Sequence, residues 1–82
     1  MDEFLSTREV GWLLDTSPET IRTRIRVGDV NGVRLPGGFR VPRAEALRLA
    51  RERIKSESGR KVSDRALQRL VDKVIATNEA RS

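Results

Sequence analysis

The chain of 82 residues contains no cysteine, no histidine and no tyrosine, and only one tryptophan and two phenylalanines. Without cysteine it can form no disulfide and offers no thiolate nucleophile. Without histidine or cysteine, a transition-metal site would depend on carboxylates alone, and the residue used most often for acid–base catalysis is missing. We therefore expect no metal, no cofactor and no enzymatic activity.

Long apolar runs are also lacking. No run approaches the roughly 18 apolar residues that a membrane-spanning helix needs, and the chain does not open with a signal-peptide pattern. Apolar residues make up 37% of the chain and charged residues 35%, which is enough for one small core. We expect a single small protein in the cytoplasm, with no membrane partner and no small-molecule substrate.

Basic residues exceed acidic ones, by 17 to 12, and 14 of the basic residues are arginine. The excess lies in residues 43–82, which contain eleven basic and six acidic residues, whereas residues 1–42 contain six of each. Arginine binds phosphate and guanine through two parallel hydrogen bonds, so this composition fits a nucleic-acid partner. A genome rich in G and C, which encodes arginine in preference to lysine, is the alternative explanation, because a net charge of +5 alone is weak evidence.

Residues 6–15 carry the signals of a first helix. Ser6 and Glu9 have the spacing of a capping box, in which each side chain bonds to the backbone N–H of the other residue. Gly11 leaves room for a neighbouring backbone to come close. We expect this helix to end near Asp15.

Residues 17–28 contain three arginines at alternate positions, Arg22, Arg24 and Arg26, as a strand with one charged face would. The segment begins with Ser17 and Pro18, which are typical of a helix cap and of the first helical position. Arg22 and Arg26 are four residues apart, so a helix places them on one face. That face is exposed and also carries Glu19 and Thr23. The strand interpretation gives the Ser-Pro pair no role, so we favour the helix.

Only about three residues separate these two helices. Two short helices joined by so tight a turn form the helix-turn-helix arrangement, whose second helix enters the major groove of DNA. A simple helical hairpin with a charged outer face is the alternative. The spacing alone favours DNA binding only slightly.

Residues 33–41 predict a two-stranded hairpin around a Pro-Gly-Gly tip. We expect its apolar side to face the core and its other side to present Arg34 and Arg40. A tip formed by Gly37 and Gly38 has no bulky side chain and can approach a phosphate backbone closely. A plain solvated hairpin with charged outward positions is the alternative.

Two further helices follow the hairpin. Residues 43–57 carry an inner stripe of Leu47, Ala50 and Ile54, and a helix capped by Ser63 runs to about Ala80 with its own apolar stripe. An exposed tryptophan off the apolar face of the first helix is costly. We therefore predict one contact surface, either within a chain or between neighbouring chains, formed by Trp12, Leu67, Leu70, Val71 and Val74.

The stretches LSTREVGWLLDTSPETIRTRI and GDVNGVRLPGGFRVPRAEA together resemble the excisionase and MerR-like winged-helix DNA-binding domains. The stretch LSTREVGWLLDTSPETIRTRI is similar to the capped helix and the Ser-Pro recognition helix of that family, and GDVNGVRLPGGFRVPRAEA is similar to its wing. The resemblance covers roughly residues 4–50. It implies a mainly α fold with a small β-hairpin: a winged helix-turn-helix domain over residues 1–57, with an additional C-terminal helix in an extension over residues 58–82.

The resemblance also implies which residues contact DNA. In the recognition helix these are Ser17, Glu19, Thr20, Arg22, Thr23 and Arg26, and in the wing Arg34, Gly37, Gly38 and Arg40. An aromatic residue is common in the family where this chain has Arg24. For Arg24 a salt bridge with Asp15 or Glu19 and a DNA contact both stay open.

The function implied is sequence-specific binding of double-stranded DNA without enzymatic activity, in the nucleoid. We favour an excisionase-like architectural factor, which bends DNA to assist site-specific excision, with an integrase or recombinase as a partner and self-association on DNA. One alternative is a small transcriptional regulator of the same fold. Another, from a different class, is a protein-interaction or oligomerisation module such as the recognition subunit of a phage packaging machine.

Overall fold

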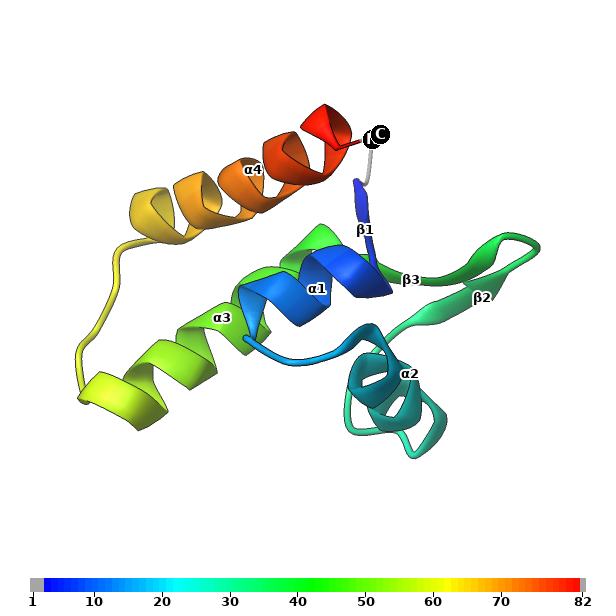
Figure 1. Ribbon diagram of the computed structural model, residues 1–82. Helices are drawn as coiled ribbons and strands as arrows, with labels where there is room; N and C mark the ends of the chain where they lie inside the picture. Colours follow the sequence, from blue (N-terminus) through cyan, green and yellow to red (C-terminus); the bar gives the residue numbers. More distant parts are fainter. Residues whose placement is uncertain (1–2, 82) are drawn as a thin grey trace.

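The computed structural model describes residues 3–81 and is mainly helical with a small antiparallel sheet (Figure 1), which confirms that part of the expected fold. Within this range every helix is too short or too polar to cross a lipid bilayer. The elements are β1 Phe4–Ser6, α1 Thr7–Leu13, α2 Pro18–Arg26, β2 Val33–Leu35, β3 Gly38–Pro42, α3 Arg43–Ser58 and α4 Asp64–Ala80.

The helices begin where their caps predict. The Ser6 Oγ accepts a hydrogen bond from the Glu9 N–H at 3.1 Å, and Glu9 Oε1 accepts one from the Ser6 N–H at 2.7 Å, which completes the capping box of α1. Ser17 caps α2, with Pro18 at its first position, and Ser63 caps α4. The helical interpretation of residues 18–26 is therefore confirmed.

The first helix ends earlier than we expected. α1 stops at Leu13 because Asp15 adopts a left-handed backbone conformation, with φ at 54°. The Thr16 N–H then donates back to the Gly11 carbonyl at 2.8 Å, which closes the connection to α2. A Cβ atom on Gly11 would lie only 2.7 Å from the Thr16 carbonyl oxygen. Gly11 thus allows the close approach that the sequence suggested.

The sheet has the strand order β1-β3-β2, with both neighbouring pairs antiparallel. The β2–β3 hairpin confirms the two expected strands, and in Figure 1 it projects away from the helices. β1 was not expected. It is three residues long, too short to show an alternating pattern, and it pairs with β3 so that Leu5 lies opposite Val41.

The hairpin register corrects one prediction. Arg34 pairs with Phe39 and Val33 pairs with Arg40, because only Pro36 and Gly37 connect the two strands. Residues paired across an antiparallel sheet lie on the same face. Arg34 and Arg40 therefore lie on opposite faces of the sheet rather than together.

The apolar side of the hairpin also differs from the expectation. Val33 is 40% exposed and Leu35 is 46% exposed, so β2 contributes neither side chain to the core. Only Val41 of the hairpin is fully buried, because β3 continues past β2 and crosses the helices next to β1. The hairpin tip thus stands clear of the core.

A single core joins the sheet to all four helices. In α3 the most buried side chains are Ala46, Leu49 and Ala50, whereas Leu47 and Ile54 are only partly buried. The predicted stripe of Leu47, Ala50 and Ile54 does pack against the core, but it left out Ala46 and Leu49, which are more deeply buried. The core is formed by Leu5, Val10, Leu13, Ile21, Val30, Val41, Ala46, Leu49, Ala50, Leu67 and Val71.

Candidate nucleic-acid interface

The outward side of α2 is polar along its whole length. Ser17, Thr20 and Thr23 are exposed, and the hydroxyl groups of Ser17 and Thr20 lie 3.0 Å apart at the start of the helix. Ile21 is fully buried beneath this side and Ile25 is partly buried. Burial of the isoleucines therefore turns the polar residues outward.

Glu19 lies between two arginines on this exposed side. Its Oε2 atom is 3.0 Å from Nη1 of Arg22, and its Oε1 atom is 3.6 Å from Nη1 of Arg26. One carboxylate balances two guanidinium groups, so the set keeps an excess positive charge. Because all three side chains are at least 40% exposed, water weakens these ion pairs and the arginines can exchange them for other anions.

A cation–π contact connects α2 to the hairpin. The guanidinium carbon of Arg26 lies 5.9 Å from the centre of the Phe39 ring. Arg34 is paired with Phe39 across the strands, so it lies on the same face of the hairpin. We call this continuous polar and basic area the α2–hairpin surface; it consists of Ser17, Glu19, Thr20, Arg22, Thr23, Arg26, Arg34 and Phe39.

Arg40 lies outside the α2–hairpin surface, on the other face of the sheet. Its Nη1 atom donates to the Phe39 carbonyl oxygen at 2.9 Å. Its guanidinium group runs beside the turn, since Cβ atoms added to Gly37 and Gly38 would meet it at 3.6 and 3.7 Å. Arg40 is therefore separated from the α2–hairpin surface by the sheet and lies beside the tip of the hairpin.

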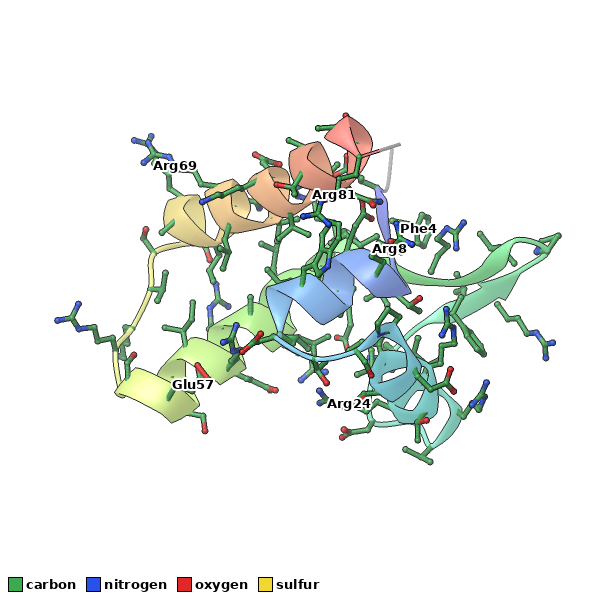
Figure 2. All side chains as sticks on the ribbon, viewed as in Figure 1. Phe4, Arg8, Arg24, Glu57, Arg69 and Arg81 are labelled. Carbon is green, nitrogen blue, oxygen red and sulfur yellow. The ribbon has the colours of Figure 1, made fainter. Side chains whose placement is uncertain are left out.

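Arg24 is turned away from Arg22 and Arg26. Figure 2 shows it on the side of α2 that faces α3, and it lines a hollow there together with Leu14 and Arg53. Its Nε atom donates to Asp29 Oδ2 at 2.7 Å. Arg24 thus forms a salt bridge, one of the two roles left open for it, but with Asp29 rather than Asp15 or Glu19, because the chain after α2 folds back and brings Asp29 to the arginine.

A buried carboxylate supports the loop between α2 and the hairpin. Glu45, at the start of α3, is 7% exposed and accepts a hydrogen bond from the Asn31 N–H at 2.9 Å. The hydrogen bond from Arg48 holds the pKa of Glu45 below its ordinary value, against the opposing effect of burial. The hydrogen bond from the Asn31 N–H therefore ties the loop to α3, and the ion pair with Arg48, within α3 itself, holds the accepting carboxylate in place.

The residues predicted to form a contact surface with Trp12 meet within one chain, between α1 and α4. Leu67 and Val71 are fully buried in the core, so they cannot contact a second molecule. Leu70 and Val74 line a groove beside Trp12. Figure 2 shows Arg81 reaching from the end of α4 toward α1, where its guanidinium carbon lies 5.3 Å from the centre of the Trp12 ring.

Two residues of this region were not among the predicted DNA contacts. Phe39 joins α2 to the hairpin, and nothing in the spacing of the sequence indicates its contact with Arg26. Val27 is 72% exposed directly after α2. Val27 does not share the helix face of Ile21 and Ile25, and this spacing could have indicated that its side chain is exposed.

Comparison with protein-family models, with curated proteins and with solved structures found no match to this chain.

Proposed function

We propose that this protein is a sequence-specific, non-enzymatic double-stranded DNA-binding protein of the winged helix-turn-helix type, with α2 in the major groove and the hairpin against the adjacent backbone. The observation that supports it best is the α2–hairpin surface. One exposed helix face carries two arginines beside a single carboxylate, and the contact between Arg26 and Phe39 fixes this face relative to a protruding hairpin.

The chemistry of these side chains fits base recognition. Arg22 and Arg26 can each bind a guanine edge or a phosphate, Glu19 can accept a hydrogen bond from a cytosine amino group, and Thr23 can contact a thymine methyl group. Binding would exchange the exposed ion pairs of Glu19 for contacts with DNA. Arg34 is suited to the phosphate backbone, because its side chain makes no hydrogen bond or ion pair elsewhere in the described part of the chain.

Selection of binding sites from random duplexes, followed by salt titration, tests this proposal. We expect a selected duplex to bind at least about tenfold more tightly than random DNA, with affinity falling by nearly one log unit per log unit of salt for each phosphate contact. Arg26→Ala should lose about tenfold or more in affinity at particular base pairs. If no duplex exceeds random DNA by about tenfold, the proposal of sequence-specific binding is wrong.

Arg24→Ala is the matched control for Arg26→Ala. It removes the same charge from the same helix, but from a side chain that pairs with Asp29 and faces α3. We expect it to weaken binding by less than about threefold, as loss of distant charge does. Equal losses for both variants would show that net charge, rather than the α2–hairpin surface, governs binding.

Within this proposal we favour an excisionase-like architectural role over that of a small transcriptional regulator. Bending of the selected site, measured by the separation of two fluorophores at its ends, distinguishes the two roles. A straight complex with no effect on the activity of an integrase would favour the regulator.

A further inference from the structure

The connection between α3 and α4 gathers a second group of basic side chains. Residues 55–65 contain two carboxylates, Glu57 and Asp64, and both are paired with arginines of α3 outside this segment. Glu57 pairs with Arg53 and Asp64 pairs with Arg51. Among the described residues 3–81, four basic side chains of the segment have no carboxylate partner: Lys55, Arg60, Lys61 and Arg65. We call these four residues the α3–α4 corner.

Three of these side chains converge on one hollow. Lys55, Arg60 and Lys61 line it together with Arg51, and Val62 supplies its only apolar side chain. Gly59 shapes the site, because its left-handed conformation, with φ at 69°, ends α3 and turns the basic residues that follow toward Lys55. The hollow thus gathers four basic side chains, of which Arg51 alone is paired with a carboxylate of residues 3–81, that of Asp64.

The corner faces away from α2. Arg53 and Glu57 lie on the opposite side of α3 from Arg51 and Lys55, about 160° around the helix. Arg53 donates to the Leu13 carbonyl oxygen at 2.9 Å, which places its side of α3 against α1. In Figure 1 the α3–α4 connection and the hairpin lie at opposite ends of the molecule. The corner is therefore a separate surface from the α2–hairpin surface.

We propose that the α3–α4 corner binds the phosphate backbone of a second DNA duplex segment, so that one molecule holds two segments together. This inference rests on the proposed function, since the first segment is the one bound by the α2–hairpin surface. A protein partner fits the corner less well, because lysine is depleted from protein interfaces and two of the four basic side chains of the corner are Lys55 and Lys61. Within residues 3–81, no aromatic or amide side chain lines the hollow, so the contact is independent of base sequence.

Energy transfer between short duplexes that carry a donor or an acceptor fluorophore measures this bridging directly. Wild-type protein should bring donor and acceptor duplexes together at low salt, and anisotropy of one labelled duplex should report binding to the first site. The variant Arg60→Gln/Lys61→Gln should keep binding to one duplex within about threefold but reduce bridging by about tenfold, since each lost phosphate contact weakens the second site.

The matched control is Arg69→Gln/Lys73→Gln. It removes one arginine and one lysine from exposed positions on α4, and neither side chain has a carboxylate partner within residues 3–81. It should bridge as the wild type does. Equal loss of bridging in both double variants, or unchanged bridging in Arg60→Gln/Lys61→Gln, would overturn the inference. So would bridging that appears only with a dimer in sedimentation.

A third variant, Arg22→Gln/Arg26→Gln, separates this inference from the proposed function. If the wild type binds one duplex through these arginines but does not bridge, the corner inference fails and the proposed function stands. If duplex binding survives this variant but is lost in Arg60→Gln/Lys61→Gln, the corner is the DNA site and the proposed function fails. Absence of any duplex binding overturns both.

Discussion

At the scale of single residues, the three arginines of α2 lie in two different environments. Arg22 and Arg26 lie four residues apart, so any helix places them on one face, and both indeed pair with Glu19. The partner of Arg24 depends on the chain beyond the helix. Asp29 approaches it because the Asp29 N–H bonds to the Arg24 carbonyl at 2.8 Å, a return of the loop that no periodic pattern encodes.

Glu45 gives a prediction about pH at the same scale. Its pKa lies below the ordinary value of 4.5, chiefly through the hydrogen bond from Arg48, so the folded state holds the carboxylate form more strongly than the unfolded chain does. The stabilisation is complete above about pH 5 and is lost as the pH falls through the lowered pKa. We expect the wild-type melting temperature to fall more between pH 6 and pH 3 than that of Glu45→Gln.

Glu52→Gln is the control for this measurement. Glu52 also pairs with Arg48, at 2.7 Å, but its side chain is 61% exposed, so the pair contributes only about 0–1 kcal/mol. At neutral pH Glu45→Gln should destabilise the fold by about 1–3 kcal/mol, because Arg48 and the Asn31 N–H lose a charged acceptor. If the pH dependence of Glu45→Gln matches that of the wild type and Glu52→Gln, the Glu45 carboxylate does not stabilise the folded state.

At the scale of elements, local signals predicted where helices begin, and three-dimensional packing decided where they end and how the strands pair. The caps at Ser6, Ser17 and Ser63 each follow from a few adjacent residues. The end of α1 depends on the conformation of Asp15, and the faces of Arg34 and Arg40 depend on a two-residue turn. One residue of difference in that turn moves a side chain to the opposite face of a sheet.

Gly11→Ala tests the connection between α1 and α2. The new Cβ atom would meet the Thr16 carbonyl oxygen at 2.7 Å, so the backbone must shift. We expect a loss of about 1–3 kcal/mol from this overpacking, larger than the gain of at most about 1 kcal/mol in helix propensity. Chemical unfolding followed by circular dichroism measures the balance.

Gly37→Ala is the control for Gly11→Ala. Its Cβ atom would meet only the end of the Arg40 side chain, at 3.6 Å, and Gly37 is not in the left-handed region. Its stability should change by less than about 0.5 kcal/mol. A Gly11→Ala protein as stable as Gly37→Ala would show that the connection tolerates a wider separation of the two helices.

At the scale of the whole molecule, α4 contributes to the same core as the rest of the chain. Leu67 and Val71 are fully buried beside Leu5 and Val10, and α4 packs against both α1 and α3. The sequence predicted the apolar stripe of α4 but not its partner, because an amphipathic helix fits an intramolecular and an intermolecular contact equally well. The proposed boundary at residue 58 stays a prediction, and unfolding can test it.

Leu67→Ala distinguishes one cooperative unit from two. Removing this fully buried side chain should cost about 2–5 kcal/mol. Trp12 is the single tryptophan and lies in the groove beside α4, so its fluorescence reports the α1–α4 contact, while circular dichroism reports all the helices.

With one core, both signals of the variant shift together to the same lower denaturant midpoint. If the fluorescence transition moves alone, residues 58–82 unfold independently. Leu70→Ala, at a partly buried position, should shift both midpoints less.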